Sequence, residues 1–367
     1  MFKIAIQPGW QIQGTDASAG PAFDTALLLR LLAGIRASGS IAAAGRLEGL
    51  SYRHVWGLLR SAEELFGTPL LEKQPGRGTQ LSHLGMVLLL AEDRIRARLS
   101  PTLDSLASEL EAEIRKAVAP DRAPLRLYAS HGFAVAALVD WINAANMPVE
   151  LRYRNSTEAV AALARGECDL AGFHVPLGEF QGEAVRQYLQ WLDPSKHVLV
   201  QLALRAQGLC VAPGNPKRIV ELADLVRPGV RFVNRQAGSG TRMLLELMLG
   251  RDRVLPQDIN GFDSTEFTHA AVAAYIASDM ADVGFGIETA ARRFGLDFVP
   301  LVTERYFFAV EQGPLKARRL DEVLTILRSP GFVQRLEALP GYEPVRTGEV
   351  LTLAQAFGPA ALGVQPS

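Results

Sequence analysis

The order of short elements over residues 39–85 constrains the fold of this chain more than any other feature. Residues 41–47 are Ala-rich and long enough for one short helix, which the Ser40 hydroxyl can cap. The next three residues fit a tight turn, and Ser51 can cap a second helix that runs to about residue 66. Two capped helices across a tight turn predict a helix-turn-helix.

Elements on either side complete a small domain. Residues 24–36 carry apolar side chains at helical spacing, which predicts a helix before the motif, and residues 3–7 alternate well enough for a short strand. Residues 70–73 and 79–81 are typical of two short strands. Arg77 lies between two glycines in the connecting turn, so it is a candidate contact to phosphates or to the minor groove at the tip of a wing.

The second helix of such a motif enters the major groove with its N-terminal end toward base edges. Its buried face is expected to consist of Val55, Leu58 and Leu59. The side chains expected at the N-terminal end are Tyr52, Arg53, His54 and Trp56. The alternatives are a core position for Trp56, a solvated surface position for His54 and a phosphate-only contact for Arg53.

A long amphipathic helix is predicted from residue 84 to about residue 118, with leucines, isoleucines and a valine along one stripe. Pro101 predicts a kink or a break, with Ser100 as a new cap. Pairing with a second copy would bury the stripe, which predicts a homodimer or homotetramer. The alternative is packing on the chain's own globular domain.

The composition excludes few classes of protein. A chain of 367 residues is expected to hold two or three domains, and a net charge of −1 gives no overall basic field that would indicate a nucleic-acid partner. Two cysteines are too few for a disulfide framework and lack the spacing of a zinc site, so buried free thiols are expected. We predict no metal, no cofactor, no membrane span and no signal peptide, and hence a cytoplasmic protein.

After a linker at 119–124 the pattern changes to alternating strands and helices, which predicts an α/β fold with mostly parallel sheets. Residues 198–211 fit one long apolar strand or a pair, and shorter strands are expected at 298–300 and 306–310. In an open sheet of this kind a ligand lies beyond the C-terminal strand ends. The polar side chains at those ends are Ser130, His131, Asn155, Ser156, Thr157, His174 and Arg235.

Gly238, Ser239, Gly240 and Thr241 open a helix and would surround an anion with backbone N–H groups and hydroxyls. Arg235 and Arg242 would add positive charge. The segment lacks the lysine of a nucleotide P-loop, so a small anion or a compact anionic metabolite is expected instead. The alternatives are a helix cap that meets no ligand, plain N-caps at Ser130 and Ser156, ordinary loop positions for the two histidines, and an ion pair for Arg242.

The segments 39–44, 50–56, 64–71 and 76–85 resemble the winged helix of LysR-type regulators, closest to the molybdate-responsive repressor branch. The resemblance covers about residues 22–118 and leaves residues 1–20 without a role. It implies operator DNA contacts by Ser51, Tyr52, Arg53, His54, Trp56 and Arg77.

The segments 155–160, 163–174, 234–242 and 282–286 resemble type 2 periplasmic-binding-protein domains, which LysR-type regulators use as effector sensors. The resemblance implies two crossing strands, at 198–211 and near 298–310. It also implies one lobe of about residues 123–205 with 306–367 and another of about 206–305.

We therefore predict an α+β multidomain chain: an extension (1–21), a winged helix-turn-helix (22–85), a linker or dimerisation helix (86–122) and an effector-binding α/β domain (123–367). The predicted function is transcription regulation by a small anionic effector, either an oxyanion such as molybdate or tungstate or a small carboxylate such as formate, at an operator that serves a molybdoenzyme. The alternatives are a solute-binding protein and an α/β hydrolytic enzyme, although no nucleophile elbow is present and we expect no catalysis.

Overall fold

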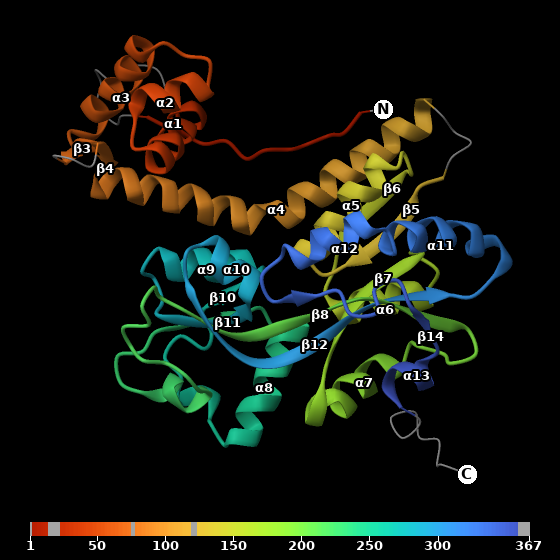
Figure 1. Cartoon of the computed structure of the whole chain (residues 1–367). Helices are drawn as coiled ribbons and strands as arrows, with labels where there is room; N and C mark the ends of the chain where they lie inside the picture. Colours follow the sequence, from red (N-terminus) through yellow and green to blue (C-terminus); the bar gives the residue numbers. More distant parts are fainter. Residues whose placement is uncertain (1, 14–22, 75–77, 119–122, 359–367) are drawn as a thin grey trace. The chain divides into compact units, whose positions relative to one another are not determined.

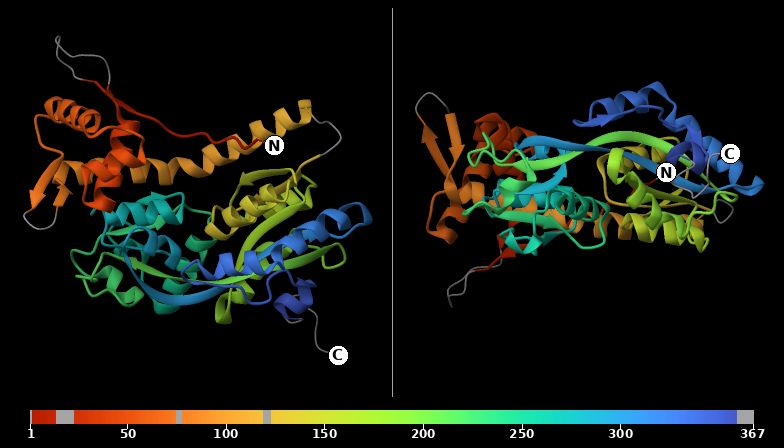
Figure 2. Two further views of the ribbon diagram at one scale, coloured as in Figure 1. Left: turned by 45° about the horizontal axis from the view of Figure 1, so that its top comes forward. Right: turned by 90° about the horizontal axis from the view of Figure 1, so that it is seen from below.

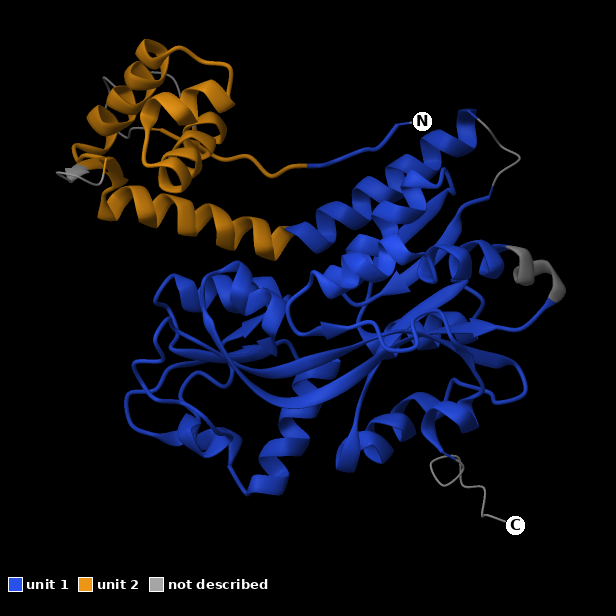
Figure 3. Cartoon of the chain, viewed as in Figure 1, with its two compact units in different colours: residues 1–6, 100–367 blue, residues 7–99 orange. Residues whose placement is uncertain are grey.

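The computed structural model describes residues 2–13, 23–74, 78–118 and 123–358, and the chain separates into two compact units (Figure 3). Residues 7–99 form one unit, and residues 1–6 with 100–367 form the other. The predicted combination of a mostly helical N-terminal part, a long helix and an α/β C-terminal part is confirmed (Figure 1).

Three helices form the core of the smaller unit, at α1 (Thr25–Ser38), α2 (Ile41–Leu47) and α3 (Tyr52–Phe66). Ser40 and Ser51 cap α2 and α3 as predicted, because their hydroxyls accept from the N–H groups of Ala43 and His54. Helices α2 and α3 approach closely at Gly45, where an added Cβ would lie 2.9 Å from Val55 Cγ2. The close packing of the two helices therefore depends on a residue without a side chain.

Two short antiparallel pairs accompany these helices, β1 (Gln11–Ile12) with β2 (Phe23–Asp24), and β3 (Leu71–Gln74) with β4 (Gly78–Leu81). The second pair is the predicted wing. It is anchored to the turn before α2, because Thr79 N–H donates to Gly39 O at 3.0 Å. Arg77 lies outside the described residues.

Helix α4 (His83–Val118) continues through Pro101 without interruption, so the predicted break with a new cap at Ser100 is wrong. Proline removes one backbone donor, but the rest of the turn stays helical. The prediction of a strand at residues 3–7 is also wrong. There Lys3 Nζ pairs with Asp140 at 2.8 Å and Ile4 N–H donates to Glu111 at 3.2 Å, so side chains rather than a neighbouring strand hold this segment.

The larger unit is built on one sheet in the order β10-β9-β11-β8-β12-β7-β5-β6, with two short strands added to β8. The strands are β5 (Leu125–Ala129), β6 (Val149–Tyr153), β7 (Leu170–Pro176), β8 (His197–Val211), β9 (Phe232–Arg235), β10 (Thr265–Glu266), β11 (Val283–Ile287), β12 (Asp297–Glu311), β13 (Tyr342–Glu343) and β14 (Val350–Leu351).

The two 15-residue strands β8 and β12 run antiparallel to each other through the middle of the sheet. The expected strands at 298–300 and 306–310 are thus one strand, with register shifts at Pro300/Val302 and Tyr306/Phe307. The expectation of a mostly parallel sheet is wrong in this centre, because β8 pairs antiparallel with β11 and β12 pairs antiparallel with β7 as well. Parallel pairing holds only toward the two ends of the sheet.

Helices cover both sides of this sheet (Figures 1 and 2). They are α5 (Phe133–Ala144), α6 (Ser156–Ala164), α7 (Gln181–Leu189), α8 (Gly240–Asp252), α9 (His269–Ala277), α10 (Glu288–Arg293), α11 (Pro314–Leu327), α12 (Pro330–Glu337) and α13 (Leu353–Phe357). Helices α5, α11 and α12 bury one face around Leu138 and Phe308, and α6 and α7 bury the other around Phe173 and Phe307. Cys168 and Cys210 are buried free thiols, as predicted.

Candidate functional site

The N-terminal end of α3 presents an aromatic and basic surface. Tyr52 and Trp56 are 56% and 47% exposed, and Arg53 and His54 are exposed as well. Val55 and Leu59 are buried in the core of the smaller unit and Leu58 is half-buried against it, so the helix has the predicted division between an apolar and a polar face. The exposure of Trp56 rules out the alternative of a core aromatic.

The α3 surface is held in place by local contacts. Ser51 caps the helix, and the Arg60 guanidinium lies over the Trp56 ring at 5.6 Å while it pairs with Glu64. Such a surface can donate hydrogen bonds to base edges and phosphates and can stack on sugars or bases. The assignment of Ser51, Tyr52, Arg53, His54 and Trp56 as DNA contacts stays a prediction.

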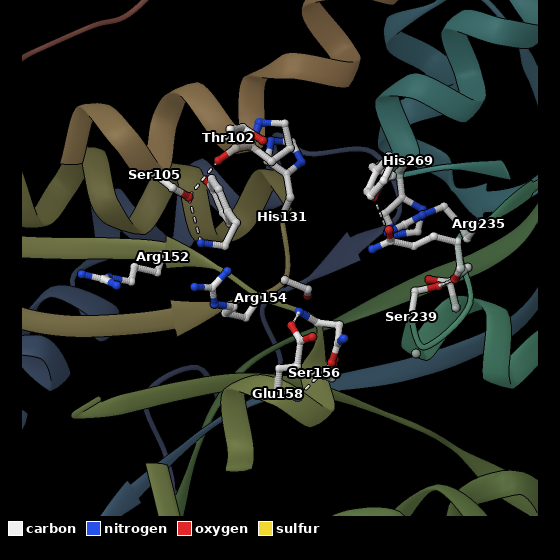
Figure 4. A pocket seen from close by; sticks show the side chains of 18 of the residues that line it. Thr102, Ser105, His131, Arg152, Arg154, Ser156, Glu158, Arg235, Ser239 and His269 are labelled. Atoms are coloured by element: carbon white, nitrogen blue, oxygen red, sulfur yellow. Dashed lines mark hydrogen bonds between the residues drawn. The ribbon is translucent and has the colours of Figure 1, made fainter. Parts of the chain in front are cut away.

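A pocket of about 360 Å³ lies at the C-terminal ends of the strands of the larger unit (Figure 4). Nine of the eleven predicted effector residues line it: Ser130, His131, Asn155, Ser156, His174, Arg235, Ser239, Gly240 and Thr241. Thr157 and Gly238 line a neighbouring cavity instead, at the same two helix ends. Residues from strands far apart in the sequence therefore meet here.

Two helices begin at the pocket. Asn155 caps α6 in a capping box with Glu158, and Ser156 is the buried first residue of that helix. Ser239 caps α8, where its hydroxyl accepts from Arg242 N–H at 3.2 Å and donates to Gln236 O at 2.9 Å. Both N-termini direct backbone dipoles toward the same space, which favours an anion.

The contacts of Ser130, Ser156 and Arg242 distinguish between the alternatives predicted for them. Ser130 and Ser156 are not N-caps, since Gly132 and Asn155 hold those positions. Their hydroxyls lie 3.5 Å and 3.4 Å from His174 Nδ1. Arg242 pairs with Glu246 at 2.6 Å and lies over the Phe262 ring, as its ion-pair alternative expected.

Three imidazoles border the pocket: His131, His174 and the unpredicted His269. Burial, together with repulsion from Arg235 and Arg293, lowers the pKa of His131 to about 4. Burial also holds the pKa of His174 and of His269 well below the ordinary value, with nearby arginines adding to the effect. All three rings are therefore neutral at pH 7.

Arg235, at the end of β9, is 7% exposed and lines the pocket (Figure 4). One of its terminal nitrogens donates to Phe267 O at 2.8 Å, and its buried Nε has no hydrogen-bond partner among the described residues. Burial and then repulsion from Arg205 lower the pKa of Arg235 to about 9. A buried cation with an open donor is destabilised until an anion reaches it.

A second buried arginine was missed by the sequence reasoning. Arg205 of β8 pairs with Glu304 of β12, its register partner, and Gln207 donates to the other oxygen of that carboxylate at 2.5 Å. Both charged residues are at most 3% exposed. The available signal was a charged residue in the middle of each long apolar strand.

The second half of α4 forms one rim of the pocket, through Thr102, Ser105 and their neighbours (Figure 4). The Ser105 hydroxyl accepts from Tyr153 N–H at 3.0 Å, and the Ser108 hydroxyl accepts from Leu151 N–H at 2.7 Å. The sequence reasoning did not place the long helix at this site. Its contact with β6 places the helix at the edge of the pocket.

The chain is similar to one known domain family and to several bacterial proteins. The PBP superfamily domain family matches residues 141–328. The uncharacterized protein YvgK of Bacillus subtilis is 31% identical over 249 residues, which cover 67% of this chain and 79% of that protein. The HTH-type transcriptional regulator CbbR of Cereibacter sphaeroides is 26% identical over 295 residues, 77% of this chain and 86% of that protein.

Among solved structures, the chain is similar to a hydrogen-peroxide-bound cysteine mutant of OxyR from Corynebacterium glutamicum. The TM-score is 0.43 at 14% identity, and the match covers 93% of this chain and 97% of that one. Within the part of the chain that the structure describes, none of the helices combines the length and the apolar character that a membrane span requires.

Proposed function

The chain belongs to the PBP superfamily, and we propose that it is a LysR-type transcription regulator. In this proposal α3 binds operator DNA, and the pocket of the larger unit binds a small anion as the effector. The anion is an oxyanion such as molybdate or tungstate, or a small carboxylate such as formate. The regulator acts as a homodimer or homotetramer through the linker helix.

The observation that carries the sensing half of this proposal is the buried Arg235 with its open Nε donor. It faces a pocket that also receives the N-termini of α6 and α8. A guanidinium with two helix dipoles and several hydroxyls is a donor set for an anion. No carboxylate of the described residues forms an ion pair with Arg235, so a bound anion would supply the missing countercharge.

The regulatory half is supported by the exposed aromatic and basic end of α3 and by the likeness to the regulator CbbR. The DNA-binding and sensing parts lie on one chain, joined by α4. Because α4 borders the pocket, a ligand that contacts its rim can bias the position of that helix.

The experiment is a thermal-shift screen of the full chain against formate, acetate, molybdate, tungstate and sulfate, followed by gel-shift titrations on the promoter fragment of its own gene. A ligand at a hundred times its Kd is expected to raise the stability by about 2.7 kcal/mol. The same ligand should change the DNA affinity. If no anion stabilises the protein, the proposed sensor function is wrong, and if no promoter DNA binds, the regulator function is wrong.

A further inference from the structure

The charged side chains around the pocket determine how many negative charges its ligand can carry. We propose that the site selects an anion with a single negative charge, a small monocarboxylate, and that Glu304 sets this selectivity. The selectivity rests on the proposed function, because it concerns the effector of that same pocket.

The rim of the pocket is electrically balanced. Arg152 and Arg154 line it together with Glu109 and Glu158. Arg152 lies 3.3 Å from Glu109 and 2.8 Å from Glu150, which stands behind the lining, and the Glu158 carboxylate accepts from Asn155 N–H in the capping box. These groups leave no excess positive charge at the entrance to attract a second negative charge of a ligand.

The interior carries one uncompensated positive charge. Arg205 forms an ion pair with Glu304, whereas Arg235 has no ion-pair partner among the described residues and feels only the longer-range attraction of Glu304. Without Glu304 the same interior would carry two positive charges. Glu304 therefore acts as a built-in counter-anion that halves the charge available to the ligand.

The imidazoles do not alter this balance at neutral pH, because burial keeps His131, His174 and His269 unprotonated. The groups that face His174 are Ser130 after β5, Ser156 of α6, Arg205 of β8, Arg235 of β9, and Glu304 and Tyr306 of β12. The groups that face His131 are Tyr153 of β6, Arg235 of β9 and Arg293 of α10. The groups that face His269 are Arg235, Arg205 and the other two imidazoles. The arginines around each ring oppose its protonation.

Size and hydrogen bonding fit a small carboxylate. A pocket of about 360 Å³ has the volume of roughly a dozen water molecules, so a carboxylate with a few further atoms fits inside. One carboxylate oxygen can accept from the open Nε of Arg235, and the hydroxyls of Ser130 and Ser156 can donate to the other. Planar carboxylates match the planar guanidinium.

The single unpaired positive charge of Arg235 would compensate only one of the two negative charges of a dianion. It would bind well only if a nearby imidazole took up a proton, so its affinity would rise as the pH falls, by up to about tenfold per pH unit for one proton. A monocarboxylate needs no such proton, and its affinity should be independent of pH between 6 and 8. Binding of a dianion must therefore consume a proton that binding of a monoanion does not.

The test is isothermal titration calorimetry of the full chain with formate and acetate, and with molybdate and sulfate. Each titration is run at pH 6, 7 and 8 in two buffers of different protonation enthalpy. For the monocarboxylates we expect the same enthalpy in both buffers and a constant Kd. For the dianions we expect the Kd at pH 8 to be at least tenfold higher than the Kd at pH 6. We also expect their binding enthalpy to differ between the two buffers, which reports proton uptake.

Glu304→Gln is the matched substitution, since the amide keeps the shape and can still accept from Arg205. We expect it to strengthen dianion binding at pH 8 at least tenfold and to abolish the proton uptake. Glu111→Gln is the control, because Glu111 is another buried glutamate paired with an arginine, outside the pocket. It should leave every Kd within twofold.

The possible outcomes separate the two proposals. Tight dianion binding at pH 8 without proton uptake in the natural protein overturns the monoanion selectivity and leaves the effector site intact. Binding of no anion at any pH overturns the effector site itself. If Glu304→Gln does not fold, the comparison of buffers on the natural protein still shows whether dianion binding takes up a proton.

Discussion

The two functional regions of this molecule differ in how their residues are brought together. The surface of α3 comes from one continuous stretch, and its geometry follows from a capped helix with one buried stripe. The pocket takes side chains from the ends of β5, β6 and β7, from the end of β9, and from the middle of β8. A local surface depends on a helix, whereas a composite pocket depends on the whole sheet.

Because of this difference, single substitutions should have local effects on α3 and wider effects in the pocket. A change on α3 alters one exposed contact and leaves the fold of its unit in place. A change in the pocket alters a network of buried charges, so ligand binding and protein stability respond together, and in opposite directions where a buried charge is removed.

The largest expected effect is that of Arg235→Gln. Loss of the guanidinium should weaken anion binding by about 3 kcal/mol, or more than a hundredfold, because charge-assisted hydrogen bonds to the ligand disappear. The free protein should become no less stable, because a buried cation without a counter-ion is removed. Titration calorimetry and urea unfolding check the two parts, and unchanged anion binding would contradict the pocket assignment.

Arg53→Ala tests the exposed surface of α3. We expect binding to a cognate promoter fragment to weaken by about 2 kcal/mol if Arg53 reads a base. Gel-shift titration at fixed salt measures the loss, and thermal unfolding of the chain should not change. A uniform loss on all sequences, with a shallower salt dependence, would instead support the phosphate-only alternative.

The stability of the chain should fall in acid because of the buried imidazoles. His131 has a pKa of about 4 in the folded protein and of about 6.5 in the unfolded chain, so the unfolded state binds more protons between these values. The free energy of unfolding should therefore decrease from pH 6.5 toward pH 4, by roughly 2–3 kcal/mol for this ring.

His131→Gln should flatten that pH dependence in chemical denaturation. An unaltered slope in His131→Gln would show that the ring is hydrated in the folded protein.

The smallest expected effect is that of Ser105→Ala. One hydrogen bond to Tyr153 N–H is lost, worth about 1 kcal/mol, so the amide of Tyr153 should exchange with solvent several-fold faster. Hydrogen exchange measured by NMR or mass spectrometry checks this, and Ser100→Ala on the same helix is the comparison. Equal exchange in both variants would mean that helix α4 leaves this strand readily.

The sequence was most informative where contacts are local. The bounds of α2 and the caps at Ser40 and Ser51 were predicted, because a hydroxyl three residues before a backbone N–H is a pattern within one turn. The predicted periplasmic-binding-protein-like sensor is confirmed at the level of the PBP superfamily, whereas the LysR type of the regulator stays a proposal. The molybdate-linked branch, the domain limits and the DNA contacts stay predictions.

The pocket was predicted in part. Residues that follow a strand or open a helix, such as Ser130 and Ser239, could be found from the rule that ligands lie at strand ends. Arg205, Glu304 and His269 were missed, because the first two lie within long strands and are brought together only by an antiparallel register. That register links residues 99 positions apart, a distance over which periodicity carries no information.

The contacts of α4 with β6 have a consequence beyond ligand sensing. Strand β6 ends the sheet, so the N–H groups of Leu151 and Tyr153 on its outer side have no neighbouring strand to receive them. The hydroxyls of Ser108 and Ser105 occupy these donors. An open strand edge invites pairing with another chain, and here a helix with two serines closes it. The helix therefore also protects the sheet against edge-to-edge aggregation.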